Sequence, residues 1–509
     1  MTPDRLAEVL EALADGPPWD TAWLRSLLPE LAVRGRLVAQ EEGDLELALE
    51  SVQAAKNDLI ANGQIPKPRA LGKTLDNVSA KIPGHWLAAP LSLALEFDLT
   101  DGDWVESKDQ DPNGGVRLTQ LADVGVGRFR DRSDRHLTTQ KAEELRCTML
   151  EPNDVLIARL PDPLGRACLF PGDTKPCVTV VDVAIARSRS NAIVPQFLVM
   201  AMNSPMMREI VETFATGTTR KRISTGNLRK TCIPLPPLAE QHRIVAKVDE
   251  LMGHVAVVEE RHLAATSARV RFRDAALHAL AEAEDHEAVE AAWSRIEDHF
   301  DDLFTEPEDI QPLRQTILQL AVRGRLVAQE AGDEAVRPIQ DLCKSISTSG
   351  HKVKTSQIEK SGPVPVVDQG QGLIAGYTSR RDLAITVDAP MLVFGDHTRA
   401  IKFIDFDFVA GADGTKILRP VGVDARYLYV SIQAADLESR GYGRHFKILK
   451  ATEIRVPPLA EQHRVVAKVD ELMALCDTLE VSLTRAKTTR EQFASSISHA
   501  LTGPTAASA

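Results

Sequence analysis

The sequence predicts an α+β chain. In this fold, two α/β domains are separated by two long antiparallel, coiled-coil-like helices that are related by an internal pseudo-twofold repeat. One observation is that PPLAEQHRIVAKVDELM, which begins at Pro236, recurs from Pro457 with Val465 in place of Ile244. A second is that LAVRGRLVAQE occurs at 31–41 and again, unchanged, at 320–330. The stretches between these markers show no convincing similarity, so a repeated frame holds two unlike inserts.

The markers divide the chain into five regions, and a chain of 509 residues is too long for a single core. The predicted regions are an N-terminal helical region (1–74), a first insert domain (75–235), a central helical region (236–330), a second insert domain (331–456) and a C-terminal helix (457–509).

Each PPLAEQ segment predicts a long helix. Paired prolines suit the first turn of a helix, and Glu240 or Glu461 in that turn favours the helix dipole. Apolar residues then recur at spacings of three and four, and the helical pattern extends for about 40 residues, or ~60 Å. A helix of this length needs a partner of similar length, and the other copy is the natural candidate. Two separate bundles, each closed by its own neighbours, are the alternative.

The inserts have a different pattern. Short apolar runs such as DVLIARL and APMLVFG, bounded by Gly, Pro and Asp, predict strands. The segments VPQFLVMAMNSPMMREIVETFA and ARYLYVSIQAADLES predict short helices between them. Each insert is therefore expected to form a compact domain of mixed secondary structure, with Trp86 in the core of the first.

Composition limits the class of protein. Hydrophobic residues make up 43% and charged residues 26% of the chain, which is typical of a folded soluble protein. No apolar run approaches the ~20 residues that cross a bilayer, and the N-terminus lacks the plan of a secretory signal. The six cysteines form no CxxC pair. These features predict a cytoplasmic protein without a disulfide framework or a membrane partner.

Charge is distributed unevenly. The net charge is −12, but residues 75–235 carry 20 basic and 20 acidic side chains, and residues 331–456 carry 17 and 15. The excess of acid therefore lies in the repeated helical regions. This distribution is compatible with inserts that bind nucleic acid and helices that contact proteins.

Catalytic and metal-binding motifs are missing. The segment PRALGKT resembles the end of a phosphate loop, but Lys67 stands where the first glycine is required. His242 and His463 occupy matching helix positions, yet neither has a second ligand four residues on. We therefore expect no catalytic residue, no metal site and no cofactor in this chain.

Basic and amide side chains in the inserts are the candidate DNA-binding residues. Arg and Lys suit phosphate contacts, and Arg and Gln read base edges in the major groove. Clusters of this kind lie near the end of both inserts, which favours function over a merely solvated surface. The candidates are Arg128, Arg130, Arg220, Lys221 and Arg222 in the first insert, and Gln369, Gln371, Arg380, His397, Arg399, Lys402, Arg444, His445 and Lys447 in the second.

With its twin PPLAEQHR helices, its LRQTILQLAVRGRLVAQE motif and its two dissimilar inserts, the chain resembles the specificity subunit of a type I restriction–modification system. The segments VFGDHTRAIKFIDFDFVAGADGTKIL and IPGHWLAAPL resemble parts of the target-recognition domains of that family. The resemblance implies that each insert reads one half of a bipartite, asymmetric double-stranded DNA site. It also implies that the long helices set the spacer between the two halves.

The resemblance implies partners as well. Two modification (methyltransferase) subunits would dock on the helices, and two restriction (motor/nuclease) subunits would join them. S-adenosylmethionine, ATP and Mg²⁺ would belong to these partners. Two other readings stay open: a scaffold that binds partners but whose recognition domains no longer read DNA, and an enzyme.

Overall fold

The computed structural model describes residues 21–40, 43–68, 70–189, 192–217, 220–329, 335–411, 414–435, 437 and 444–502. The first twenty residues of the predicted N-terminal helical region lie outside them. The chain forms two compact units: unit 1 draws on residues 1–265 and 490–509, and unit 2 on residues 266–489. In the described part of the chain, no helix combines the length and the apolar character that crossing a bilayer requires.

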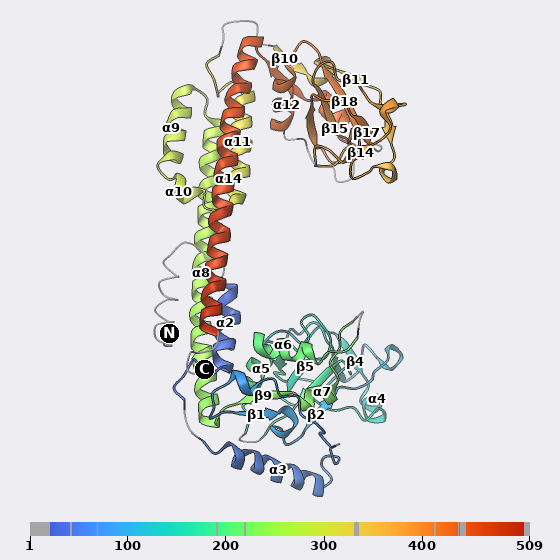
Figure 1. Cartoon of the computed structure of the whole chain (residues 1–509), viewed down its shortest axis with the longest axis vertical. Coiled ribbons are helices and arrows are strands. Elements are labelled where there is room, and N and C mark those ends of the chain that lie inside the picture. The colour runs from blue at the N-terminus through green and yellow to red at the C-terminus, as the bar shows by residue number, and fades with distance from the viewer. Residues whose placement is uncertain are drawn as a thin grey trace. The chain divides into compact units, whose positions relative to one another are not determined.

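Two long helices contribute to both units (Figure 1). Helix α8 spans Leu238–Glu282 and helix α14 spans Leu459–Thr502, with no proline inside either. Each begins directly after its proline pair and carries a glutamate, Glu240 or Glu461, in its first turn. The shorter helices of the repeated regions are α2 (Ala22–Val33), α3 (Leu45–Ala61), α9 (His286–Glu297), α10 (Phe300–Leu303) and α11 (Ile310–Val322).

In unit 1, the first half of α8 packs against the last turns of α14 and against α2. Ile244, Val248 and Val255 of α8 share one buried cluster with Leu24 of α2, and Leu501 of α14 packs on it. Arg36 follows α2 and donates to the carbonyl of Leu501. The start of one long helix therefore lies beside the end of the other.

In unit 2, the same arrangement is built from the opposite ends. Leu277 and Leu280, near the end of α8, share a buried cluster with Cys476 of α14 and with α11. Arg325 follows α11 and donates to the carbonyl of Ala283, just past the end of α8, at 2.6 Å. The antiparallel pairing is therefore confirmed, and the alternative of two separate bundles is wrong.

Each unit contains an ion pair that has a counterpart in the other unit. Arg25 of α2 binds Glu259 of α8, and Arg314 of α11 binds Glu480 of α14 at 2.9 Å. Arg25 and Arg314 are 289 residues apart, the offset of the LAVRGRLVAQE motif, and Glu259 and Glu480 are 221 apart, the offset of the long helices. The repeat therefore extends beyond the two motifs that the sequence displays.

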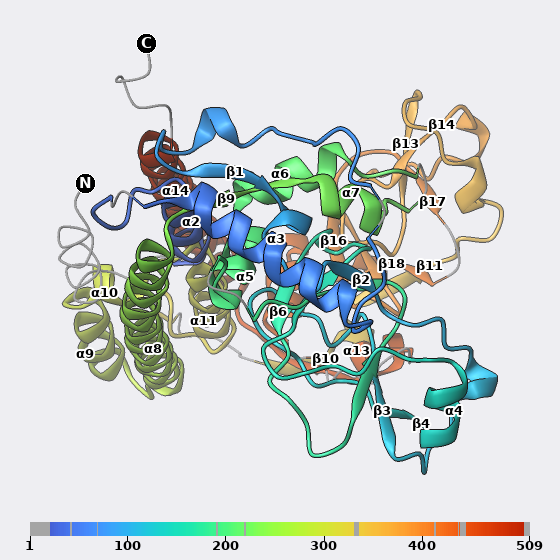
Figure 2. The ribbon, with the colours of Figure 1, turned by 90° about the horizontal axis from the view of Figure 1, so that it is seen from below.

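The first insert contains two main sheets with strand orders β2-β8-β5-β6 and β4-β3-β7, and a two-stranded ribbon of β1 and β9. Helix α3 packs against this domain, where Lys56 donates to the carbonyl of Ser92 at 2.9 Å (Figure 2). The elements are β1 (Leu87–Pro90), β2 (Leu99–Asp101), β3 (Val116–Thr119), β4 (Arg135–Leu137), α4 (Thr139–Glu144), β5 (Val155–Ala158), β6 (Ala167–Leu169), β7 (Cys177–Thr179), β8 (Val183–Ala186), α5 (Pro195–Asn203), α6 (Pro205–Thr213), α7 (Thr225–Lys230) and β9 (Cys232–Leu235).

The second insert contains sheets with strand orders β11-β18-β15-β16 and β12-β17-β13-β14, and a ribbon of β10 and β19. The elements are β10 (Ala335–Pro338), β11 (Cys343–Ile346), β12 (Lys352–Val353), β13 (Val364–Val367), β14 (Gly376–Thr378), β15 (Met391–Gly395), β16 (Ile401–Ile404), β17 (Val409–Gly411), β18 (Thr415–Pro420), α12 (Ala425–Ala434), α13 (Phe446–Ala451) and β19 (Glu453–Val456).

The two inserts share one topology. The antiparallel order β2-β8-β5-β6 matches β11-β18-β15-β16 strand for strand, and the parallel pair β3–β7 matches β13–β17. In each insert the first strand in the sequence pairs with the last. Leu87 of β1 lies opposite Leu235 of β9, and Ala335 of β10 lies opposite Val456 of β19. The inserts show no convincing similarity in sequence, and the structure reveals that they nevertheless fold alike.

One glutamine joins each long helix to its insert. Gln241 is fully buried; its side-chain oxygen accepts from the backbone N–H of Val194 at 2.8 Å, and its amide donates to Ala192 and Pro236. Gln462 accepts from the backbone N–H of Asp424 at 2.8 Å in the same way. Val194 and Asp424 are the N-caps of α5 and α12, so the two bonds are equivalent. We call these bonds the glutamine latch.

The glycine of each LAVRGRLVAQE motif also touches its insert. Gly35 and Gly324 have φ angles of +64° and +69°, a conformation that favours glycine. A Cβ on Gly35 would lie 2.4 Å from the ring of Pro83, which precedes the buried side chain of Trp86. Trp86 packs edge-to-face on Phe197 at 6.5 Å, as expected for a core residue.

Replacing Gln241 with alanine tests the latch. We expect the Gln241→Ala variant to lose about 2–4 kcal/mol of the stability of unit 1, because buried backbone groups of Val194 and Ala192 lose their partners. Urea denaturation, followed by amide hydrogen exchange of the β1–β9 ribbon, measures this loss. Gln53→Ala is the control, because the Gln53 side chain is exposed and donates to Asn57 on the same helix. A loss no larger than that of the control would contradict the latch.

Candidate nucleic-acid interface

The turn after β15 gathers several loops of the second insert. Asp396 begins this turn; its carbonyl accepts from the backbone N–H of His445 at 2.9 Å, and its carboxylate accepts from that of Phe446 at 2.8 Å. Thr398 donates to the carbonyl of Gln369. The loops 368–371, 396–400 and 444–446 therefore meet, and we call them the second rim.

Arginines project from this rim. Arg399 is exposed, with a left-handed φ of +62°, and its guanidinium donates to the carbonyl of Leu437 at 2.7 Å. Arg444 is exposed just before α13, and Lys447 is exposed on its first turn. Gln371 is exposed, whereas Gln369 and His397 are half-buried between the loops. Six of the nine candidates of the second insert thus lie on or beside one rim with some surface open to solvent.

Two candidates are buried instead. Lys402 is 4% exposed; its ammonium donates to the carbonyl of Asp368 at 2.8 Å and lies 3.5 Å from its carboxylate. Burial lowers the pKa of Lys402, against the opposing pull of Asp368. His445 is 1% exposed, and its ring hydrogen-bonds the carbonyl of Asp396. This placement differs from the expectation that both side chains contact DNA: they hold the rim together and are not open to a ligand.

Arg380 lies apart from the rim. In the β13–β14 hairpin, Thr378 pairs with Val364, so Arg380 follows the end of the hairpin that is opposite Gln369. Its guanidinium binds Asp382 through two hydrogen bonds of 2.8 and 2.7 Å. The structure therefore does not bring Arg380 together with the other candidates.

In the first insert, the turn 159–166 after β5 holds two loops. Arg159 donates to the carbonyl of Ile223, whose own N–H donates to the carbonyl of Arg159, both at 3.1 Å. Arg166 donates to the carbonyl of Val124 at 2.7 Å. The turn 159–166, the loop 124–130 and the segments 216–217 and 220–223 form the first rim, at the position in the fold that the second rim occupies.

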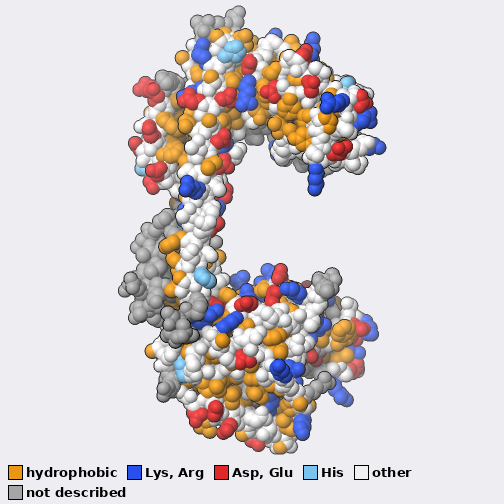
Figure 3. Space-filling view, viewed as in Figure 1, with side chains coloured by type: hydrophobic (Ala, Val, Ile, Leu, Met, Phe, Trp, Pro, Cys, Tyr) orange, Lys and Arg blue, Asp and Glu red, His pale blue; other side chains and the backbone are white. Residues whose placement is uncertain are grey.

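Acidic neighbours partly neutralise the cations of the first rim. Lys221 pairs with Glu212 at 2.7 Å, and Arg222 pairs with Asp182 at 3.2 Å. Arg220 is exposed and has no ion pair within the described residues. Over both inserts, Lys and Arg side chains alternate with Asp and Glu on the visible face rather than forming one unbroken patch (Figure 3).

Arg128 and Arg130 lie on the 124–130 loop. Arg128 is exposed at the tip, where its carbonyl accepts from Gly125 at 3.1 Å, and Arg130 is half-buried. The sequence analysis missed Arg159 and Arg166, which are 7% and 4% exposed and shape the rim from inside. Their only signal was their position at the two ends of a turn rich in proline and glycine, RLPDPLGR.

Within the described residues, no three His, Cys, Asp or Glu side chains gather closely enough to hold a metal ion. All six cysteines are described and none forms a disulfide.

Comparison with known proteins shows what this chain is similar to. A family model for the type I restriction–modification DNA specificity domain matches residues 175–263, from just before β7 into α8. The specificity subunits of the EcoAI and EcoEI type I restriction enzymes of Escherichia coli are each 28% identical to this chain, over 356 and 361 residues. The chain is similar to the specificity subunits of type I restriction–modification systems. This family is not catalytic, in agreement with the lack of catalytic motifs in the sequence.

Each alignment covers 68% of this chain but 58% of the Escherichia coli specificity subunit, so the chain spans little more than half the length of these relatives. Among solved structures, a chain from a study of complex assembly and conformational transition of the type I restriction–modification system superposes with a TM-score of 0.53. That match has 18% identity and covers 82% of this chain and 98% of the other. At this level of identity the match shows that the two chains share a fold.

Proposed function

We propose that this chain is the DNA sequence-recognition subunit of a type I restriction–modification complex. Each insert is a target-recognition domain that reads one half of a bipartite, asymmetric site. The single observation that carries this proposal is the pair of rims: two domains of one topology expose different side chains at the same position. Two unlike readers on equivalent frames suit a site with two unlike halves.

The rims supply the chemistry that DNA binding needs. Exposed arginines such as Arg220 and Arg444 suit phosphate contacts, which fix the protein on the duplex without reading sequence. Arg399, Gln371 and Arg128 carry groups that pair bidentately with purine edges in the major groove. We propose residues 75–235 and 331–456 as the limits of the two domains, since the β1–β9 and β10–β19 ribbons lie just inside them.

The long helices are proposed to set the spacer between the half-sites. Helix α8 has 45 residues and helix α14 has 44, which gives each a length of ~67 Å at about 1.5 Å per residue. A rod of this length spans about two turns of duplex, at about 34 Å per turn.

The partners are proposed from the same repeat. Two equivalent helical frames suit two copies of one modification subunit, which would bind S-adenosylmethionine and methylate a flipped base. Two motor/nuclease subunits, with ATP and Mg²⁺, would complete the complex. No step of this chemistry is assigned to residues of this chain.

A second candidate function is a scaffold whose recognition domains do not read sequence. The ion pairs Lys221–Glu212, Arg222–Asp182 and Arg380–Asp382 favour it, because each removes a cation from the surface available to phosphates. Gel-shift assays of the complex with its modification subunit separate the two. A complex with one duplex that survives excess competitor DNA supports sequence reading, and competition by every duplex alike supports the scaffold.

Arg220 is the first residue to replace. We expect Arg220→Ala to weaken binding to all DNA sequences alike and to reduce the slope of log affinity against log salt by about 1. Removing Lys221 and Arg222 as well adds less, because both are already paired with carboxylates. Arg380→Ala is the control, since Arg380 is also exposed but lies away from the rim. An unchanged salt slope in Arg220→Ala would count against a phosphate contact.

Exchange of residues 331–456 for the second insert of another specificity subunit tests sequence reading itself. We expect one half of the recognised site to change and the other half to stay, because the second insert has its own ribbon of first and last strands and its own glutamine latch. Mapping of methylated bases in the host genome by sequencing measures both halves. A change in both halves would contradict independent reading by the two domains.

A further inference from the structure

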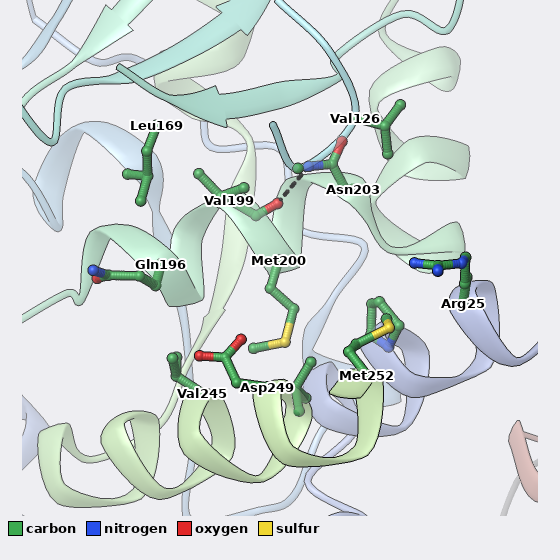
Figure 4. A pocket seen from close by; sticks show the side chains of 13 residues that line it. Arg25, Val126, Leu169, Gln196, Val199, Met200, Asn203, Val245, Asp249 and Met252 are labelled. Atoms are coloured by element: carbon green, nitrogen blue, oxygen red, sulfur yellow. Dashed lines mark hydrogen bonds between the residues drawn. The ribbon is translucent and has the colours of Figure 1, made fainter. Parts of the chain in front are cut away.

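Unit 1 contains a groove between the long helix and its recognition domain. Residues of α2, α5, α8, β6 and the turn 126–127 line a hollow of about 460 Å³ (Figure 4). Its floor is apolar, with Val199, Met200 and Met252, and Asp249 stands on α8 facing α5. The Asp249 side chain is exposed and has no ion pair or hydrogen bond within the described part of the chain.

Unit 2 fills the same place with its own side chains. Arg426 of α12 binds Asp470 of α14 at 2.8 Å. Its guanidinium lies over the rings of Phe403 and Tyr429, at 5.3 and 5.2 Å from their centroids. These two rings also contact each other edge-to-face at 6.0 Å. An arginine, two aromatic rings and a carboxylate thus pack together at this position of unit 2.

The two sets of residues occupy equivalent positions. Gln196 and Arg426 both stand two residues after the N-cap that the glutamine latch holds, and Asp249 and Asp470 are 221 residues apart, the offset of the long helices. Leu169 and Phe403 lie on the matching strands β6 and β16. The pairs, unit 1 first, are Leu169 and Phe403, Gln196 and Arg426, Val199 and Tyr429, and Asp249 and Asp470.

In each of the three pairs that differ, unit 1 has the smaller side chain. The carboxylate on the long helix is present in both units. Where unit 2 has an arginine, a phenylalanine and a tyrosine, unit 1 has a glutamine, a leucine and a valine. The groove in unit 1 therefore lacks the cation and the aromatic surface that its counterpart receives from within the chain. The volume and the open charge of Asp249 define what would fit there.

Charge decides the class of ligand. The other charged side chain at the groove, Arg25, is bound by Glu259, which leaves Asp249 as the unmatched charge. A carboxylate repels the phosphates of nucleic acid and attracts a guanidinium, which can bind it bidentately. An arginine buried beside apolar surface is also a common anchor in protein interfaces.

We infer that the groove of unit 1 receives an arginine, flanked by aromatic or large apolar side chains, from a protein partner of this chain. This inference rests on the proposed function, because the partner that docks on the helical frame is the modification subunit. In unit 2, Arg426 and Tyr429 of the chain itself make the contact that a partner would make in unit 1. The two copies of the modification subunit therefore dock on unequal surfaces, and one of them makes a contact that the other cannot make.

Grafting the unit 2 residues into unit 1 tests the inference. The variant Leu169→Phe, Gln196→Arg, Val199→Tyr fills the groove from within, as unit 2 does. Native mass spectrometry and calorimetric titration with the purified modification subunit measure both binding events on the full chain. We expect one of the two affinities to fall by at least about tenfold and the other to stay.

Single substitutions keep the test valid if the triple variant does not fold. Asp249→Ala changes an exposed residue, and we expect it to weaken the same single binding event by about tenfold. Asp470→Ala is the matched control, because Asp470 is already bound by Arg426 within the chain. Two unchanged affinities in both Asp249→Ala and a folded triple variant would overturn the inference.

A photo-crosslinking residue in place of Val199 identifies the occupant in the assembled complex with DNA. A crosslink to the modification subunit, beside an arginine, supports the inference; a crosslink to DNA or to a second copy of this chain overturns it. Specific DNA binding by the wild-type complex is measured in parallel. Its absence would refute the proposed function and leave the result on partner binding intact.

Discussion

The structure depends on one arrangement: the far end of each long helix closes the unit in which the other long helix begins. In unit 1, Arg36 donates to the carbonyl of Leu501 at the end of α14, and in unit 2, Arg325 donates to that of Ala283, just past the end of α8. Carbonyls at a helix end lack intrahelical partners and attract cations, so an arginine there both caps the helix and fixes its position. Because Leu501 packs on one core and Leu277 belongs to the other, neither repeat completes its core from its own residues.

The glutamine latch explains how one frame holds two unlike domains. Gln241 and Gln462 bond to backbone atoms of their inserts, the N–H groups of Val194 and Asp424, and not to side chains. A hydrogen bond to the backbone places no demand on the side chain of the residue that donates it, provided that the helix begins at the same point. At this contact the sequences of the inserts are therefore free to differ while their topology stays fixed. The groove beside Asp249 is a second place where the frame is shared and the filling is not.

Repetition made the frame predictable. The doubled PPLAEQ and LAVRGRLVAQE segments predicted two long antiparallel helices, since proline pairs, a glutamate in the first turn and apolar spacing are local signals. The shared topology of the inserts carried no such signal, because strand order depends on pairings between distant residues such as Ala335 and Val456. The candidate site was predictable only as a region. From the sequence, Lys402 and His445 were expected on the surface. In the structure both are buried, Lys402 bonded to the carbonyl of Asp368, 34 residues away in the chain, and His445 to that of Asp396, 49 residues away.

Amide hydrogen exchange of the two arginine variants tests the central claim most directly. The account predicts that Arg36→Ala speeds exchange in the last turn of α14 and leaves the last turn of α8 unchanged, and that Arg325→Ala does the reverse. Faster exchange at the end of α8 in Arg36→Ala, or no change at the end of α14, would contradict the closing of each unit by the opposite helix.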